Sequence, residues 1–542
     1  MIMLHGLIIA LLLYYPLPQK TYVTSGFMES RMGRFHAGID LGTNMQEGVP
    51  IISPENGEIY HIHIFNGGYG KAMYMRGNSG KIYVFAHLSR FRSDINKYVL
   101  GQQFKTFQYT QNLYFKSRFL VTRNEIIAYT GSSGLKSPHL HFEMRSKSND
   151  PINPIPFLNI DDTIPPEIDS VMIVPSDYHS YTSGLPIPRI VRNNDSISIK
   201  GKFGIIVFCK DYIDNFKYKT VPYEITLITN KINNIVFKAN KFKYQNNRFA
   251  SWFFYRNHKG WGIRLYKNPD SPNLVSPFCG NVSISASDFA GNTNDFHFFV
   301  IESCKNNIKL PDSDMIFTNG IIHITGKYRQ LNFSGANIIK SIHSENIYHF
   351  LLSPLSDTIC VGKDTFYRLT RKKFLIKKGK YTISLGRNSL REQVIMHLSL
   401  KDDSLLIKFS DTPFEKPLVI TNNKYRKKEI FYNALNGAYM GTRKAKIRNS
   451  MILSVKLDTL PPEVFSVKKE RDTIFVSVKD IDSKIRLNSV SAYYNSIRLL
   501  SIPTKRGFKF ISNKRLPENG LFLLRCEDIL NNKLLYKKQF YR

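Results

Sequence analysis

The chain has 542 residues, of which 42% are hydrophobic and 22% charged, and its mean hydropathy is −0.25. At roughly 150 residues per domain this length predicts about three or four domains and excludes a single small module. The composition also excludes a disordered tail and a polytopic membrane protein, so we expect a globular chain that folds in water.

Basic residues outnumber acidic ones by 76 to 42, which gives a formal net charge of +34. Such an excess favours anionic partners. Nucleic acid is not expected, because the chain has no RNP signature, no zinc-finger spacing and no basic region that leads into heptads. The basic residues are spread over the whole length, as is typical of solvated faces. An anionic envelope surface, either cell-wall polymer or lipid headgroups, fits the positive charge as well as nucleic acid does.

An apolar stretch lies near the N-terminus, at residues 4–13, and ends before Pro16 and Pro18. It is too short for a membrane span of about 20 residues and has the length of a signal-peptide hydrophobic region, although no Lys or Arg precedes it. We therefore predict a signal-like segment over residues 1–19 and an exported protein of the periplasm or cell envelope. A buried N-terminal strand is the alternative. The five cysteines form no Cys-x-x-Cys pair, which excludes a cysteine zinc site.

Short runs of alternating hydrophobicity, separated by glycines, fill the region from about residue 20 to 160. Examples are residues 57–64, 82–86 and 126–129. No helical period is evident between them, so the pattern predicts a small, mostly antiparallel β domain over residues 20–160.

Two nearly identical segments divide the rest of the chain. Asp-Thr-Ile-Pro-Pro-Glu occupies residues 162–167, and Asp-Thr-Leu-Pro-Pro-Glu occupies residues 458–463. A double proline stiffens a linker and cannot lie in a central strand, so both segments are expected to be domain joints. The short strands and Asn/Gly/Asp turns that follow are typical of Ig-like β-sandwiches. The expected units are a β-sandwich module at 165–307, a β-rich module at 308–456 and a C-terminal β-sandwich module at 457–542.

Four histidines of the first domain have an unusual context. His36 and Asp40 form His-x-x-x-Asp, His139 and His141 form His-x-His, and His87 lies in Phe-Ala-His-Leu. A catalytic zinc ion takes three protein ligands and leaves a fourth position for water. His36, Asp40 and one member of the His-x-His pair would supply that set. The pair projects from the same face of a strand, about 6 to 7 Å apart, so one imidazole binds metal while the other stands beside the metal-bound water.

Each of these motifs alone is weak evidence. Gly38 lies between His36 and Asp40. Because it has no Cβ, it lets the chain turn tightly enough for both side chains to converge. His61 and His63 have the same His-x-His spacing but no flanking Gly, Pro or acid, and we expect them at the surface.

Taken together, the motifs resemble the M23 (LytM/lysostaphin-type) zinc metallopeptidases over about residues 21–158. The likeness rests on five segments that occur in the family's order: residues 31–40, 68–70, 85–89, 130–134 and 138–143. The Asp-Thr-x-Pro-Pro joint and the Asp-x-x-Gly-Asn turn are more weakly similar to large exported members of the family from the Bacteroidetes group.

The resemblance implies a zinc ion bound by His36, Asp40 and His141, and a small antiparallel β domain whose groove admits an extended peptide. It also implies that His139 and His87 act on the water and the transition state. His139 is then the favoured general base, and His87 orients the water or stabilises the oxyanion, although the two roles can be exchanged. The implied activity is hydrolysis of peptide cross-links in peptidoglycan.

The chain departs from the family pattern at Phe85, where Tyr is usual, at Ser137, where Gly is common, and over an insertion-like stretch at about 98–119. None of these departures removes a ligand. The first alternative function is a non-catalytic wall-binding or hydrolase-activating module, and the second is nucleic-acid binding, which rests on charge alone. The modules after residue 166 offer no comparable cluster of His, Asp, Glu or Cys, so we expect them to be dispensable for the chemistry and to serve placement.

Overall fold

A computed structural model describes residues 14–541 of the chain, apart from residues 32, 136, 214–216, 230–232, 258–259, 267–273, 277, 302–309, 328–329, 345, 391–392, 411–413 and 415. The apolar stretch at residues 4–13 therefore lies outside the described residues. The described residues include no helix with the length and apolar character that crossing a membrane requires. Strands account for 53% of the structure and helices for 6%, which confirms the prediction of a mainly β fold.

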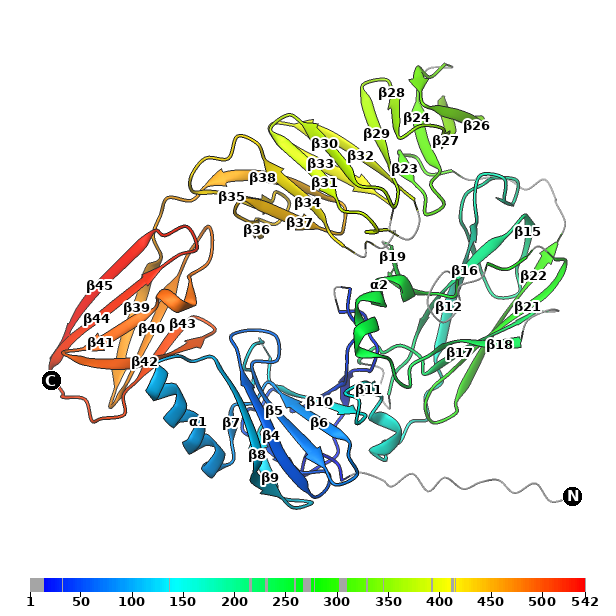
Figure 1. Cartoon of the computed structure of the whole chain (residues 1–542). Helices are drawn as coiled ribbons and strands as arrows, with labels where there is room; N and C mark the ends of the chain where they lie inside the picture. Colours follow the sequence, from blue (N-terminus) through cyan, green and yellow to red (C-terminus); the bar gives the residue numbers. More distant parts are fainter. Residues whose placement is uncertain are drawn as a thin grey trace, which may run out of the picture.

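The first domain is built on one large antiparallel sheet, with the strand order β1-β2-β10-β6-β5-β4-β8 and with β11 paired to β10 (Figure 1). In that order its strands are β1 (Val23–Ser25), β2 (Ile39–Gly42), β10 (His139–Arg145), β6 (Ile82–Ala86), β5 (Lys71–Gly77), β4 (Gly57–Ile64), β8 (Gln111–Val121) and β11 (Pro151–Ile152). A small sheet of β3 (Pro50–Ile52), β9 (Ile126–Tyr129) and β7 (Arg90–Phe91) accompanies it. Every residue of β6 is buried, as expected for a central strand that is covered on both faces.

The domain also contains a helix, α1 (Ser93–Thr106), which the sequence pattern did not predict. Its buried side chains are Ile95, Val99 and the polar Gln103, which recur once per turn. With only two apolar residues on the buried face, the helical period has almost no hydrophobic signal in the sequence. The insertion-like stretch at 98–119 thus consists of the end of α1, a turn and most of strand β8, which extends the large sheet at its edge.

The second unit consists of two sheets and two short helical segments. Its sheets have the orders β14-β12-β16-β20-β19 and β13-β15-β22-β21-β17-β18. The elements are β12 (Glu167–Pro175), β13 (Tyr181–Thr182), β14 (Arg189–Val191), β15 (Ser196–Lys200), β16 (Phe203–Lys210), β17 (Glu224–Thr229), β18 (Asn233–Lys238), η2 (Tyr244–Phe249), α2 (Ala250–Phe253), β19 (Phe254–Asn257), β20 (Gly260–Arg264), β21 (Gly280–Ser287) and β22 (Thr293–Ile301). The 3-10 turn η1 (Ile155–Phe157) precedes them.

The third unit contains three sheets, with the orders β23-β24-β27-β26, β25-β28-β29-β32-β33-β38-β35-β36 and β30-β31-β34-β37. Its strands are β23 (Met315–Ile316), β24 (Ile322–Gly326), β25 (Phe333–Ser334), β26 (Ala336–Ser344), β27 (Ile347–Pro354), β28 (Thr358–Val361), β29 (Asp364–Leu369), β30 (Phe374–Lys378), β31 (Tyr381–Leu385), β32 (Val394–Lys401), β33 (Ser404–Phe409), β34 (Leu418–Asn422), β35 (Glu429–Asn433), β36 (Tyr439–Gly441), β37 (Lys444–Ile447) and β38 (Met451–Leu457).

The last unit is a single run of strands in the order β39-β40-β43-β42-β41-β44-β45. Its elements are β39 (Glu463–Glu470), β40 (Thr473–Lys479), η3 (Leu487–Ser489), β41 (Ser491–Tyr494), β42 (Ile497–Thr504), β43 (Gly507–Ile511), β44 (Gly520–Glu527) and β45 (Lys533–Phe540). The domain boundaries expected near 165, 308 and 457 stay predictions, and the second of them falls among residues outside the described part of the chain.

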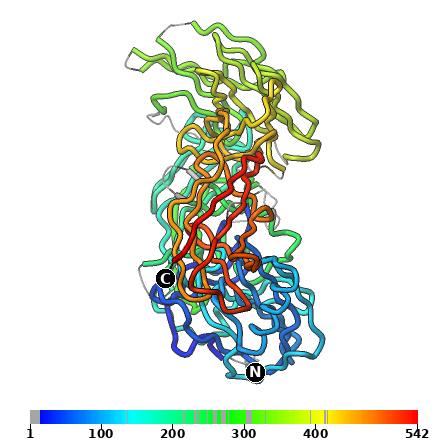
Figure 2. The backbone as a smooth tube through the Cα atoms, turned by 90° about the vertical axis from the view of Figure 1, so that its left-hand side faces the viewer, coloured from blue at the N-terminus to red at the C-terminus, as the bar shows by residue number. Residues whose placement is uncertain are grey.

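The units follow one another around an open ring, and the last one returns to lie beside α1 of the first domain (Figure 1). The Arg498 guanidinium lies over the Phe107 ring there, 4.7 Å from its centroid. Seen from the side, the molecule is elongated, with the first domain at one end and the third unit at the other (Figure 2). The first domain and the second unit share one continuous apolar core, and the last unit has a core of its own. The third unit has two cores of its own and shares a smaller apolar cluster with the second unit.

Candidate metal centre

Strands β2 and β10 lie side by side and bring two of the expected ligands together. They pair antiparallel, with Asp40 opposite His141. His36 precedes β2, where its backbone N–H donates to the Glu29 carbonyl at 2.8 Å. A Cβ at Gly38 would lie 2.2 Å from the Phe142 carbonyl oxygen, so only glycine allows this close approach to β10. This contact is the physical reason for the glycine between His36 and Asp40.

His36, Asp40 and His141 converge on one point. His36 Nε2 lies 3.2 Å from Asp40 Oδ1, His141 Nδ1 lies 2.9 Å from the same oxygen, and the two nitrogens are 3.0 Å apart. Ligands at 2.0–2.1 Å from a tetrahedral zinc ion are about 3.3 Å apart, so the spacing of these three atoms is close to that of a zinc ligand set. All three side chains are buried and form a candidate metal site.

Hydrogen bonds on the far side of each imidazole fix which nitrogen faces this point. His36 Nδ1 lies 2.7 Å from the Gly26 carbonyl oxygen, which can only accept, so Nδ1 carries the proton. His141 Nε2 donates to Glu143 Oε1 at 2.9 Å. The remaining nitrogens, His36 Nε2 and His141 Nδ1, face the centre. A metal ion there would take the place of the Nδ1 proton that His141 shares with Asp40, and both nitrogens would then offer it a lone pair.

The second oxygen of Asp40 is also held. Arg31 donates to Asp40 Oδ2 at 2.7 Å and to the Ser25 hydroxyl at 2.5 Å. Burial disfavours the charged carboxylate, but His36 and the hydrogen bonds from His141 outweigh it and hold the pKa of Asp40 well below its usual range. Asp40 is thus an anionic ligand with one oxygen directed to the centre and the other held by a cation.

Three residues that support the centre were missed by the sequence analysis. Glu143, completely buried, also accepts from Arg145 Nε at 2.5 Å and from the Tyr69 hydroxyl. Burial would raise the pKa of Glu143, but Arg145 and His141 lower it to about 2. Burial opposes charge on His141 as well, yet its hydrogen bonds to Asp40 and Glu143 raise its pKa to about 9. The available signal was the period of two along β10, which places Glu143 and Arg145 on the same face as the two histidines.

The two other expected residues lie beside this cluster. His139 Nε2 is 3.7 Å from Asp40 Oδ1, and the ring of His87 is 4.8 Å from that of His139 and 5.8 Å from that of His141. His139 Nδ1 donates to the Ser137 carbonyl at 3.1 Å, and His87 Nδ1 donates to the Ser133 carbonyl at 3.0 Å. Each ring therefore keeps Nε2 as an acceptor.

Burial lowers the pKa of both histidines, that of His87 to about 3, so both are neutral at physiological pH. His87 also has a φ of 63°, in the left-handed region that a residue with a Cβ rarely adopts. Strain of this kind concentrates at functional sites, where the surrounding structure holds it in place.

His61 and His63 lie on β4, where they are half-buried rather than fully exposed. His61 stacks on the Tyr114 ring, with centroids 4.2 Å apart, and its Nε2 lies 2.7 Å from Asn112 Oδ1. These contacts give the pair a structural role on the outer strands. Phe85, at the position where Tyr is usual, is completely buried against the Phe142 ring and forms part of the core.

The second unit supports the segment that carries His36. Phe35, which is 4% exposed, packs against the rings of Phe242, Phe253 and Phe254, with centroids 5.0, 5.3 and 6.2 Å away. Its backbone N–H donates to Asn247 Oδ1 at 2.5 Å. The metal-ligand segment is therefore enclosed by residues from beyond the Pro-Pro joint.

Comparisons with known proteins gave matches among solved structures only; no family model and no curated protein sequence matches this chain. The chain is similar to a mutant catalytic domain of the prophage-encoded M23 protein EnpA from Enterococcus faecalis, at 22% identity over 26% of this chain and 95% of that one, with a TM-score of 0.20. It is similar to a zinc-containing peptidase from Vibrio cholerae, at 24% identity over 26% of this chain and 38% of that one, with a TM-score of 0.20.

Immunoglobulin domains 1–4 of Sidekick-1 match 70% of this chain and 99% of that one, at 7% identity and a TM-score of 0.14. These identities and TM-scores are too low to carry an argument about function.

Proposed function

We propose that this chain is an exported zinc metalloendopeptidase that hydrolyses peptide cross-links of peptidoglycan in the periplasm or cell envelope. The observation that carries the proposal is the convergence of His36, Asp40 and His141, with two neutral histidines beside them. Two imidazole nitrogens and one carboxylate oxygen form the donor set of zinc sites that keep a position for water. The net charge of +34 favours attachment to an anionic envelope.

Zinc in this site would lower the pKa of a bound water toward 7 and polarise the scissile carbonyl. His139 is the favoured general base, because Ser137 holds its Nδ1 proton and its neutral Nε2, 3.7 Å from Asp40 Oδ1, is free to accept one. His87 uses its Nδ1–H on Ser133, so in the neutral form it can only accept at Nε2. This favours orientation of the water as the role of His87, whereas oxyanion stabilisation would require a second proton on the ring.

The alternative of a non-catalytic wall-binding module requires only the fold. Nothing in such a role needs a neutral pair of histidines beside a metal site, and His87, the buried member of the pair, keeps a strained backbone in addition. These features favour catalysis.

The test combines metal analysis with muropeptide profiling of sacculi incubated with the full chain. We expect about one zinc per chain, its loss in His36→Ala, and its retention in His139→Ala together with a fall in hydrolysis of about 10² to 10⁴-fold. Full zinc occupancy in His36→Ala would refute the ligand assignment. A zinc-loaded wild-type chain that leaves sacculi unchanged would favour the non-catalytic alternative.

A further inference from the structure

A second kind of cluster lies in the last unit, far along the chain from the metal centre. Asp458, Asp480 and Asp528 are buried, and one carboxylate oxygen from each lies within 4.8 Å of the others. The sequence analysis expected no cluster of chemistry-bearing residues after residue 166, and this expectation is wrong. The three aspartates come from distant positions and share no spacing motif, so only the fold brings them together.

The second unit repeats the arrangement with Asp162, Asp211 and Asp288, which are also buried within 4.8 Å of one another. In both units the first aspartate opens the Asp-Thr-x-Pro-Pro joint. The second follows a strand that pairs with the first strand after the joint, β16 in one unit and β40 in the other. The third begins a turn that ends four residues later in asparagine, at Asn292 or Asn532.

In the last unit, hydrogen bonds from backbone N–H groups and from the Asn532 amide hold these carboxylates in place. Asp528 Oδ1 accepts the backbone N–H groups of Leu530 and Asn532 at 2.7 and 2.8 Å. Asp480 Oδ1 accepts the backbone N–H of Ser483 at 2.5 Å. The Asn532 amide donates to Asp528 Oδ2 at 2.6 Å and to the Asp458 carbonyl oxygen at 3.1 Å, and it ties the turn to the joint.

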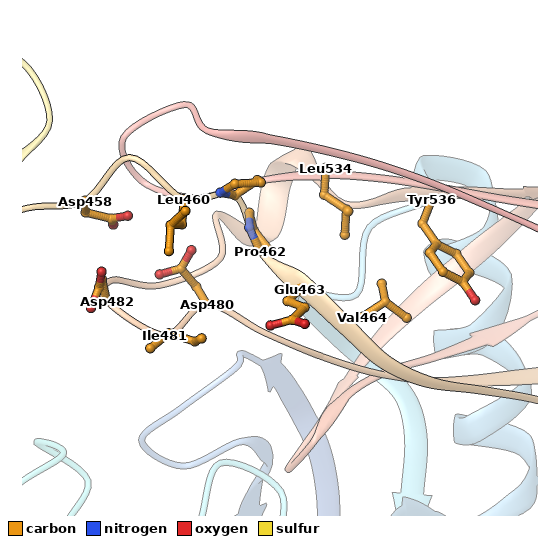
Figure 3. Close-up of a pocket in the computed structure, with 11 residues that line it drawn as sticks. Asp458, Leu460, Pro462, Glu463, Val464, Asp480, Ile481, Asp482, Leu534 and Tyr536 are labelled. Atoms are coloured by element: carbon orange, nitrogen blue, oxygen red, sulfur yellow. The ribbon is translucent and has the colours of Figure 1, made fainter.

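The environment of Asp458 favours a bound cation. Its side chain is 0% exposed, its Oδ1 has a 3.4 Å contact with the Asn532 amide, the Ser483 hydroxyl interacts with its carboxylate, and among the described residues its Oδ2 has no hydrogen-bond partner. Figure 3 shows the carboxyl groups of Asp458 and Asp480 pointing toward one another at the end of a pocket of about 310 Å³. A buried carboxylate oxygen without a partner is costly, and a cation at this point would offset that cost.

No ammonium or guanidinium group fills this role in the described part of the last unit. Lys456 pairs with Asp482 at 2.5 Å, and Lys428 donates to Asn532 Oδ1. Burial, followed by the charges of Asp480 and Asp528, raises the pKa of Asp458, and burial with the charges of Asp162 and Asp288 raises that of Asp211 to about 7. The cluster of the last unit thus concentrates negative charge that no ammonium or guanidinium group among the described residues compensates.

We propose that each cluster binds one Ca²⁺ ion and so locks a Pro-Pro joint to the β-sandwich that follows it. Oxygens at 2.3–2.6 Å from one Ca²⁺ lie at most about 5 Å apart, so three oxygens that all lie within 4.8 Å of one another can share one ion. An all-oxygen set of three carboxylates suits this hard cation, and the neighbouring pocket gives it a path and room for water ligands. Mg²⁺ demands a tighter octahedral shell and dehydrates reluctantly, so it should bind more weakly.

Structural equivalence extends the inference from the last unit to the second one. In each cluster the joint aspartate belongs to the linker, and the strand-end and turn aspartates belong to the module, so an ion bound by all three would bridge the linker and the module. The rigid, repeated joints would then set the spacing of the units when calcium is present.

The experiment uses the full chain, freed of calcium by dialysis against calcium-free buffer that contains ZnCl₂ to keep the zinc centre loaded, and titrated with CaCl₂ by calorimetry. We expect two Ca²⁺ per chain with dissociation constants of about 10⁻⁴ to 10⁻³ M, as in extracellular modules, and at least tenfold weaker binding of Mg²⁺. Asp480→Asn and Asp211→Asn should each bind one ion, and the double variant none. The matched control is Glu470→Gln, an exposed acid of the last unit that pairs with Lys468 and should leave the stoichiometry at two.

Thermal unfolding separates a binding role from a merely structural one. Calcium should raise the melting temperature of the wild type but have a smaller effect on Asp480→Asn. In calcium-free buffer the melting temperature of Asp480→Asn should equal or exceed that of the wild type because one repelling charge is gone. Absence of calcium binding to the wild type would overturn the proposal, as would undiminished binding to the double variant. A melting temperature of Asp480→Asn that is lower by the same amount with and without calcium would assign the aspartates a purely structural role instead.

Discussion

The contact between the second unit and the segment before His36 predicts that a mutation far from the metal centre weakens it. Phe253, at the end of α2, is 4% exposed, and its ring packs edge-on against Phe35 at a centroid distance of 5.3 Å. It also contacts the Phe237 ring at 6.2 Å. Phe253→Ala removes the part of this aromatic cluster that keeps Phe35, and with it His36, pressed toward β10.

The magnitude follows from the burial. Replacing a buried Phe by Ala typically costs about 3 to 5 kcal/mol of stability, because both the transfer free energy and the cavity contribute. If about 1.4 kcal/mol of this loss reaches the segment that carries His36, zinc affinity falls about tenfold. Phe253→Leu leaves most of the volume in place and should lie between the wild type and Phe253→Ala in both quantities.

The assay measures zinc affinity by competition with a chromogenic chelator, together with thermal unfolding of the full chain. Phe510→Ala is the matched control, because Phe510 is completely buried in the separate core of the last unit. It should destabilise that unit while leaving zinc affinity unchanged. Equal zinc affinities of Phe253→Ala and Phe510→Ala, with both proteins folded, would refute the inferred support from the second unit.

Two further predictions concern the centre's outer contacts and the protein's charge. Glu143→Gln should weaken zinc binding by about 10 to 100-fold, because the carboxylate that orients His141 is lost and the Arg145 charge is left without its partner. Competition with a chelator measures this affinity. The control, Glu55→Gln, alters a contact with the Tyr83 hydroxyl instead and should bind zinc normally. Attachment of the full chain to isolated sacculi should weaken as the salt concentration rises past physiological strength, where the screening length falls below about 8 Å. Co-sedimentation with the sacculi measures the bound fraction. Attachment that does not change with salt would indicate recognition that is independent of the net charge.

The sequence predicted those features that have a local signal. Alternating hydrophobicity indicated the mainly β fold, and the same period of two put His139 and His141 on one face of β10. The spacing of His36 and Asp40 around Gly38 indicated a tight convergence, and the close approach of Gly38 to the Phe142 carbonyl supplies its reason. The assignment of roles to these residues came from family resemblance and stays a prediction that the experiments above address.

Features without a local signal could not be predicted. Helix α1 has too few apolar residues for its period to stand out. Phe35 and Asn247 are 212 residues apart, and neither segment has a sequence pattern that predicts their contact. The aspartate clusters are assembled from strand ends and turns, so that Asp458 and Asp528 become neighbours only through the order of strands in the last unit.

The contacts of Phe35 change the expected division of labour between the units. All five candidate residues of the centre lie before residue 142, so a peptidase that ends near residue 160 is complete in its chemistry. Such a fragment would nevertheless expose Phe35 and lose the Asn247 hydrogen bond immediately before His36. The second unit is therefore better described as part of the centre's support than as a spacer. A calcium-locked joint at Asp162, between the β10 strand and that unit, would then stabilise the metal centre indirectly, by holding this support against it.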